Sequence, residues 1–174
     1  MTVIKENKGL GGSGSSGPKV ITMSQPEGDS ISSSSVTYLG TSGRNFFSHA
    51  GTGTSTDACA FSKKLEGWVS GAKVWIDFAT PSDGVNYVVY KAQVSVNNGG
   101  VEVQETVTFT KVLSDDTASY EKLSTEKLTL SSTITDVLTS DSNVTIKVIR
   151  DAGHEDDNDN SSSYTEFANI EYNY

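Results

Sequence analysis

Five acidic residues gather in one short stretch near the end of the chain, the densest group of potential ligands in the sequence. Residues 151–160 read DAGHEDDNDN. Hard cations such as Ca²⁺ bind several carboxylate and carbonyl oxygens, so this stretch offers suitable atoms. Its spacing departs, however, from the D-x-[DN]-x-[DN]-G order of an EF-hand loop. We therefore expect a solvated loop without a metal ion, and the weaker alternative is a cation held by Asp156, Asp157 and Asp159.

The two histidines, His49 and His154, are the candidate bases for nucleophilic catalysis. A serine or cysteine nucleophile needs a positioned base, and such sites carry local signatures such as G-x-S-x-G. The sequence has no G-x-S-x-G, and its single cysteine, Cys59, lies in no recognised nucleophile motif. We expect neither histidine to act in catalysis.

Pairs of carboxylates hydrolyse glycosidic bonds, and four acidic residues fall on predicted strands: Asp77, Glu102, Glu105 and Glu166. Their spacing brings no two of them together. Glu105 stands on the otherwise apolar side of its strand, where burial disfavours a charge unless it is paired. A charge at the rim of a sheet also discourages aggregation between strands, and we prefer that role for Glu105. The sequence predicts a protein that is not an enzyme.

Three aromatic residues are candidates for a ligand or interface surface: Trp68, Trp75 and Tyr87. Trp75 and Tyr87 alternate away from the predicted inner face of their strands, which leaves their rings available to stack on a sugar. Trp and Tyr are also enriched in protein–protein interfaces. We prefer an interface for these residues, and sugar binding stays as the alternative.

Composition limits the classes of partner. The 174-residue chain has a formal net charge of −9, so it repels the phosphates of nucleic acids and anionic membranes. The single cysteine excludes an internal disulfide and a cysteine-based zinc site. No apolar run reaches the roughly 18 residues of a membrane span, and the N-terminus does not read as a signal peptide. We expect a protein made in the host cytoplasm, without a cofactor, that binds neither nucleic acid nor a membrane.

Strand patterns become clear from residue 73 onward, whereas residues 36–68 carry a poor signal that either extends the sandwich or wraps a partner. Apolar and polar residues alternate with the period of a half-buried strand in five segments, which are residues 73–78, 86–96, 101–112, 144–150 and 164–174. The run Asn97-Asn98-Gly99-Gly100 predicts a tight hairpin between the second and third segments.

The remaining segments are less regular. Residues 120–130 predict a bulged or edge strand, and residues 133–138 predict a short helical turn or a connector. Because turns separate the strands and no amphipathic helix is evident, residues 34–174 predict one all-β domain, an antiparallel, jelly-roll-like β-sandwich.

Residues 1–33 predict an extended N-terminal arm. The Gly/Ser-rich run at residues 9–17 has few side chains to bury, and glycine loses the most backbone entropy when it is fixed. An engineered spacer is the alternative interpretation of residues 11–17, but apparently native sequence lies on both sides. We expect the arm to bind a neighbouring protein by strand addition and by burying four apolar residues, which are Val3, Ile4, Val20 and Ile21.

Three segments occur in a suggestive order: VWIDFATP at residues 74–81, VTIKVIRD at residues 144–151, and FANIEY at residues 167–172. Together with the long hairpin after the first segment and the acidic loop after the second, this order resembles a β-sandwich unit of structural proteins in tailed bacteriophages. The resemblance implies decoration (cement) subunits, head fibres or tail-associated modules, usually homotrimers, with no cofactor and no catalytic residues.

The arm and the resemblance point to the same role. We expect a non-enzymatic virion protein, a capsid decoration or cement protein that stabilises the head lattice as a homotrimer. Its expected partner is the major capsid protein or another virion protein. The alternative is a carbohydrate- or receptor-binding β-sandwich module of a phage fibre or tail.

Overall fold

The computed structural model describes seven ranges of the chain, which are residues 17–23, 36–38, 45–51, 58–81, 86–98, 100–113 and 122–174. Within these ranges the backbone is mostly strand, with one short helix, α1 (Ser132–Thr135). No helix in this part of the chain has the length and apolar character needed to cross a membrane.

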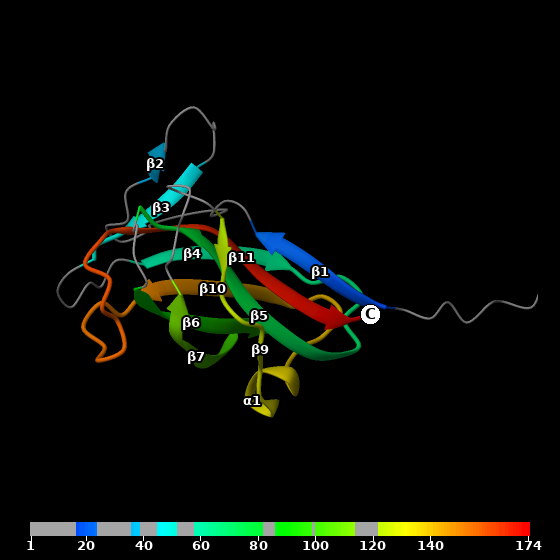
Figure 1. Cartoon of the computed structure of the whole chain (residues 1–174). Helices are drawn as coiled ribbons and strands as arrows, with labels where there is room; N and C mark the ends of the chain where they lie inside the picture. Colours follow the sequence, from blue (N-terminus) through cyan, green and yellow to red (C-terminus); the bar gives the residue numbers. More distant parts are fainter. Residues whose placement is uncertain are drawn as a thin grey trace, which may run out of the picture.

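Two antiparallel sheets pack face to face (Figure 1). Sheet A has the order β2-β3-β11-β5-β8, with β1 also paired to β11 and β9 also paired to β5. Its strands are β1 (Pro18–Met23), β2 (Val36–Tyr38), β3 (Asn45–His49), β5 (Ser70–Ala79), β8 (Leu123–Ser124), β9 (Leu128–Thr129) and β11 (Ser163–Asn173). Sheet B has the order β4-β10-β6-β7, and its strands are β4 (Ala58–Lys64), β10 (Asn143–Arg150), β6 (Tyr87–Asn98) and β7 (Val101–Leu113). The predicted all-β, jelly-roll-like sandwich is confirmed.

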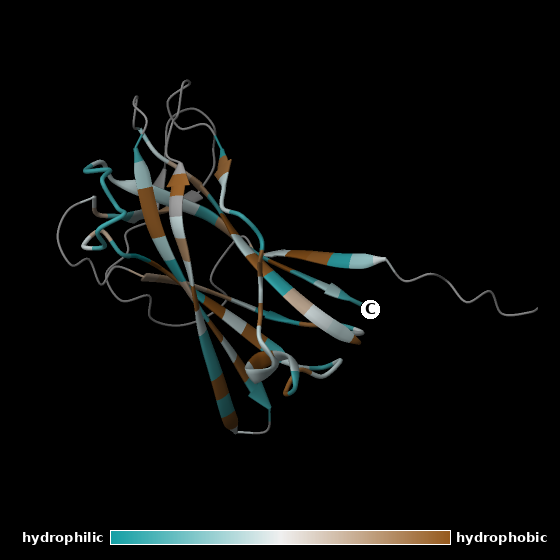
Figure 2. Ribbon diagram, turned by 60° about the horizontal axis from the view of Figure 1, so that its bottom comes forward, coloured by the Kyte–Doolittle hydropathy of each residue, from teal (hydrophilic) through white to brown (hydrophobic). Residues whose placement is uncertain are grey.

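The core fills the space between the sheets. Figure 2 shows hydrophobic and hydrophilic residues alternating along the strands, as expected when one side of each strand faces the opposite sheet. Edge-to-face packing of Phe47 in sheet A against Phe61 in sheet B joins the two layers, with 5.5 Å between ring centroids. Other fully buried members come from β5, β6, β10 and β11, and include Val74, Ile76, Phe78, Val94, Ile146, Val148 and Ile170.

The predicted hairpin joins β6 and β7, which pair from Tyr87 opposite Leu113 to Asn98 opposite Val101. Gly100 has a φ of +96°, a conformation that glycine adopts without strain. The Asn97 side chain closes the turn, since its Oδ1 accepts a hydrogen bond of 3.1 Å from the Gly100 amide.

The edge of sheet A differs from the sequence expectation. The strand expected over residues 120–130 is divided into two short strands, β8 and β9, which both pair with β5. Thr125 separates them and binds β5 with its backbone and its side chain. Its amide donates to the Ile76 carbonyl at 2.9 Å, and its Oγ1 accepts from the Ile76 amide at 3.0 Å. A side-chain oxygen therefore replaces one ladder carbonyl, and the strand is interrupted there.

The N-terminal part of the chain also differs from the expectation. The sequence assigned residues 1–33 to an arm, but Pro18–Met23 form strand β1 and pair in register with the C-terminal half of β11. Met23 is 3% exposed and belongs to the core, with Ile21 packed against it. The alternation of these six residues matches the free edge of β11, which explains why they join the sheet. Val3 and Ile4 lie outside the described residues.

Candidate functional site

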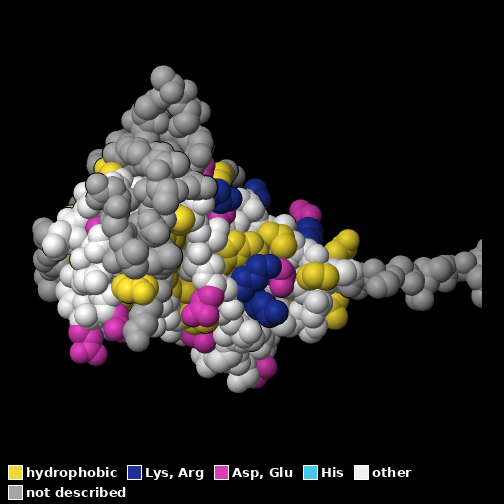
Figure 3. All heavy atoms as spheres, in the orientation of Figure 1, with side chains coloured by type: hydrophobic (Ala, Val, Ile, Leu, Met, Phe, Trp, Pro, Cys, Tyr) yellow, Lys and Arg dark blue, Asp and Glu magenta, His cyan; other side chains and the backbone are white. Residues whose placement is uncertain are grey.

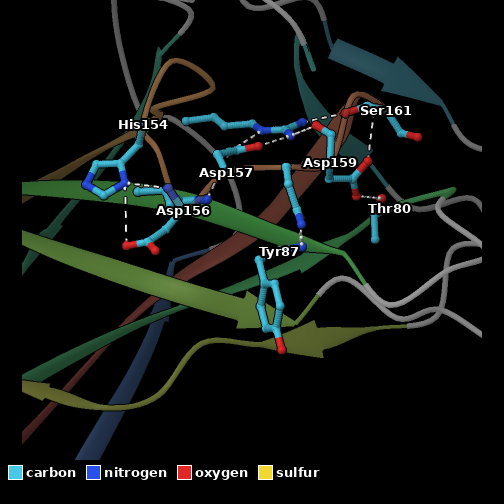
Figure 4. A network of polar contacts seen from close by, with 10 residues as sticks. Thr80, Tyr87, His154, Asp156, Asp157, Asp159 and Ser161 are labelled. Atoms are coloured by element: carbon cyan, nitrogen blue, oxygen red, sulfur yellow. Dashed lines mark hydrogen bonds and ion pairs between the residues drawn. The ribbon is translucent and has the colours of Figure 1, made fainter.

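The acidic loop forms a network of polar contacts that includes Asp157, Asp159 and Ser161 (Figure 4). The guanidinium of Arg150, at the end of β10, forms two parallel hydrogen bonds with the Asp157 carboxylate, of 3.1 Å from Nε to Oδ2 and 2.8 Å from Nη2 to Oδ1. Their side chains are 0% and 1% exposed. The same guanidinium donates to the carbonyls of Asp159 and Ser161. Arg150 thus fixes the loop from inside.

The loop also binds the backbone at the start of β6, beyond the point where the pairing of β10 with β6 ends at Arg150 and Tyr90. The Val89 amide donates to Asp157 Oδ2 at 3.0 Å, and the Tyr87 amide donates to Asn158 Oδ1 at 2.7 Å. In return, the amide of Asn158 donates to the Tyr87 carbonyl at 3.0 Å, and that of Asp151 to the Val89 carbonyl at 2.9 Å. These bonds satisfy the amides and carbonyls of Tyr87 and Val89, which are not paired with β10.

The carboxylates offered for a cation are engaged by donors of the protein itself. Asp157 accepts from Arg150 and Val89, and Asp159 accepts from Thr80 Oγ1 at 3.3 Å and from the Ser161 amide at 2.8 Å. Asp156 lies at the surface side of the loop, 3.7 Å from Nδ1 of His154. In the ranges that the structure describes, no three His, Cys, Asp or Glu side chains are grouped for a metal ion. The geometry gives the loop a structural role.

His49 and Cys59 lie together in the core. The thiol is 3.9 Å from His49 Nε2, and the same nitrogen is 2.9 Å from Thr165 Oγ1. All three side chains are 0% exposed. Burial raises the pKa of the Cys59 thiol far above its ordinary value. Because the thiolate is the nucleophilic form, this buried pair has no reactive sulfur at neutral pH.

The four strand carboxylates are distributed over both sheets. Asp77 and Glu166 belong to β5 and β11 of sheet A, whereas Glu102 and Glu105 belong to β7 of sheet B. Glu105 points inward at the edge strand, as its position in the sequence predicted. It accepts hydrogen bonds from the backbone and side chain of Ser131, at 3.1 and 2.8 Å, and thereby holds the residue that caps α1.

The three predicted aromatics do not form one platform. Tyr87 begins β6 in sheet B, and Trp75 lies on the outward side of β5 in sheet A. Trp68 packs against the core, and its indole N–H donates to the Gly71 carbonyl at 2.9 Å. Phe167, which the sequence analysis did not single out, stands opposite Asp77 on β11 and shares the outward side of sheet A with Trp75.

Two lysines cover these two rings. Lys127 places Nζ 4.4 Å from the Trp75 ring centroid and 2.6 Å from Glu171 Oε2. Lys122 places Nζ 5.3 Å from the Phe167 centroid and 2.9 Å from Asp77 Oδ2. We call this surface the lysine–aromatic face and define it by Lys73, Trp75, Asp77, Lys122, Lys127, Phe167, Asn169 and Glu171. Figure 3 shows hydrophobic, basic and acidic side chains gathered over this part of sheet A.

The centre of the lysine–aromatic face is a polar network. Asp77 accepts a hydrogen bond of 2.6 Å from Ser124 Oγ and one of 3.1 Å from Asn169 Nδ2, besides its ion pair with Lys122. Asp77 and Asn169 are 4% and 1% exposed although they point away from the core. A buried, satisfied network of this kind holds the surrounding side chains in place.

Sequence reasoning missed Arg150, although a signal was present. Val144, Ile146 and Val148 share the inward side of β10, and the same period places Arg150 inward. A charge at an inward position needs a partner, and the acidic loop follows directly. The Phe167–Trp75 neighbourhood had no such local signal, because the pairing of β5 and β11 creates it.

Comparison with known proteins gives similarities of fold. No protein-family model matches the sequence, and no curated protein gives a significant match. A solved structure of the CBM35 module of Abf62 from Cellvibrio japonicus has 9% identity and a TM-score of 0.44, over 87% of this chain and 92% of that one. A CBM28 module specific for non-crystalline cellulose has 13% identity and a TM-score of 0.42, over 86% and 84%.

A virus structure is found at the same level. One chain from the structure of infectious bursal disease virus, Gt strain, has 14% identity and a TM-score of 0.42. The match covers 90% of the present chain but 33% of the viral one. β-Sandwich carbohydrate-binding modules and a virus chain are therefore both among the structural neighbours, and similarity at this level does not extend to function.

Proposed function

We propose that this chain is a non-enzymatic structural protein of a virion, a decoration (cement) protein that ties its β-sandwich to neighbouring subunits through its N-terminal residues. The observation that carries the proposal is the position of β1. Pro18 pairs with Asn173 and Met23 with Ala168, so the strand is fixed along β11. Figure 1 shows the C-terminal residue beside the start of β1. The described N-terminal strand therefore starts at a fixed point, Pro18, beside the end of β11.

The position of β1 changes which of the four apolar residues are available to bind a partner protein. Ile21 packs against the chain's own core, and Val20 is 47% exposed on the outward side of β1. Val3 and Ile4 become the anchors of the proposed arm. A short apolar segment binds weakly alone, but three arms on one homotrimer raise its effective concentration at the lattice. The trimer and the major capsid protein as partner are parts of the proposal.

The chemistry of the described residues supports a non-catalytic role. The acids of the loop accept hydrogen bonds from Arg150 and from backbone amides, and the Cys59 thiol stays protonated in the core. Because these carboxylates and this thiol stabilise the fold, none of them is an activated nucleophile or base.

Co-purification tests the proposal. Particles purified from cells infected by the virus that encodes the chain should contain it, and a variant that lacks residues 2–16 should fold but be lost from them. The double variant Val3→Asp, Ile4→Asp should behave like the deletion. Its matched control, Thr2→Asp with Asn7→Asp, adds the same charge to the same segment and should stay attached. Absence of the wild-type chain from particles, or normal attachment of the deletion variant, would refute the proposal.

The oligomeric state is tested separately by the mass in solution. A homotrimer has three times the mass of the 18.5 kDa chain. Sedimentation of the full chain over a range of concentrations should show that trimer. A protein that stays a single chain in solution and on purified particles would contradict the trimeric part of the proposal.

A further inference from the structure

The lysine–aromatic face carries a flat aromatic ring that is covered by one exposed lysine side chain. Trp75 is half-buried on a sheet surface, with its ring under the ammonium of Lys127. The Lys127 side chain is 47% exposed, so it can move away from the ring without disturbing the core. A cation–π contact at such an exposed site is weak, because water competes for the ammonium. A ligand ring with more contact area can therefore replace the lysine on the indole.

Basic side chains surround this ring. Lys73 precedes Trp75 by two residues on the same side of β5, so the two lie about 7 Å apart along the strand. Lys73 is exposed and stands opposite Glu171, the carboxylate that Lys127 contacts. Lys127 pairs with Glu171 and Lys122 pairs with Asp77, and Lys73 adds a third lysine, so the face has one more positive than negative charge. The face therefore favours an anionic ligand, although the chain as a whole carries −9.

A hollow of about 110 Å³ adjoins the same residues. Lys73 and Glu171 line it together with the start of β1 and the end of β11, including Pro18, Tyr172 and Asn173. The pairing of β11 with β5 shifts register between Glu171 and Asn173, which opens the surface at this point. Trp75, Lys73 and the hollow thus follow one another along β5, and Lys127 reaches the Trp75 ring from the segment before β9.

We propose that the lysine–aromatic face binds an acidic glycan, a chain of sugar rings that carry carboxylates. One ring stacks on Trp75, where the apolar side of a pyranose gains contact with the indole. Its carboxylate binds the ammonium of Lys127, and a neighbouring substituent enters the hollow beside Lys73. Ligand sites combine apolar and aromatic contacts with a small number of convergent polar groups that fix the orientation of the ligand.

Affinity electrophoresis of the full-length protein tests this site. Native gels contain polygalacturonate, alginate or hyaluronate, and a parallel gel contains fully methyl-esterified polygalacturonate, which has the same sugar without the charge. We expect retardation by at least one carboxylated polymer, weaker retardation at high salt, and none by the ester. No retardation by any of the three polymers, or equal retardation by the ester, would overturn the proposal.

Variants locate the site. Trp75→Ala and Lys127→Met should each weaken binding about tenfold, and methionine keeps hydrocarbon packing on the indole while it removes the charge. Two controls make the same changes on sheet B: Tyr87→Ala, and Lys147→Met on β10. Equal losses in the controls would refute the placement. Thermal unfolding of each variant shows whether a loss of binding comes from a loss of the fold. Deletion of residues 2–16 should leave glycan binding unchanged. The glycan site and the proposed attachment through the N-terminal residues can therefore be refuted independently.

Discussion

Replacing Arg150 by methionine tests whether the acidic loop is held by one buried ion pair. The variant leaves the Asp157 carboxylate 1% exposed and without its cation, and it removes the donor from two loop carbonyls. Breaking a buried pair on one side costs about 3–5 kcal/mol, because the remaining charge is uncompensated. With a urea m-value of about 2 kcal/mol/M, the unfolding midpoint should fall by about 1.5–2.5 M.

Two further variants make this test specific. Arg150→Met combined with Asp157→Asn removes both charges, while the amide oxygen can still accept from the Val89 amide, so the double variant should be more stable than Arg150→Met alone. Lys91→Met breaks a partly exposed pair of similar length, 2.6 Å to Asp151, and should cost below about 1 kcal/mol. Urea unfolding followed by tryptophan fluorescence measures all three. If Arg150→Met costs no more than Lys91→Met, or the double variant is the least stable, the argument is wrong.

Two other predictions concern stability. Gly51→Ala should lower the free energy of unfolding in urea by about 1–3 kcal/mol, because the added Cβ would lie 2.2 Å from the carbonyl oxygens of residues 160 and 161. Gly17→Ala is the control and should be nearly neutral, because a Cβ there has nothing within 4 Å. Burial raises the pKa of Cys59, so the folded chain keeps a proton that the unfolded chain loses above about pH 8.5. Stability should therefore fall as pH rises above that value, by up to about 1.4 kcal/mol per pH unit from this group, and Cys59→Ala should show a shallower fall between pH 8 and 10. An unchanged slope in Cys59→Ala would contradict the assignment.

The sandwich was predictable because its long strands carry their own signal. Residues 144–150 and 164–174 alternate with period two, and a half-buried strand needs no further information to be recognised. The hairpin between β6 and β7 is equally local, since Asn and Gly at the turn supply the backbone conformation. These features depend on residues that are neighbours in sequence.

The features that sequence analysis misplaced depend on distant partners. Strand β1 is six residues long, and the strand that makes it part of a sheet lies about 150 residues away. The lysine–aromatic face joins side chains of β5 and β11 with lysines from the segment around β8 and β9. No single stretch contains enough of either feature to reveal it. The acidic loop is the intermediate case, since Arg150 and Asp157 are near in sequence but their pairing required the inward position of the arginine.

The pairing of β1 with the end of β11 places the start of β1 and the acidic loop at opposite ends of β11. β11 runs from Ser163, where the acidic loop ends, to Asn173, which lies beside the first residue of β1. Eleven residues of extended strand span about 33 Å. A sandwich tethered by its N-terminal residues therefore displays the acidic loop about that distance away from its attachment point. A tag added after Tyr174 would emerge beside the start of β1, at the opposite end of β11 from the acidic loop.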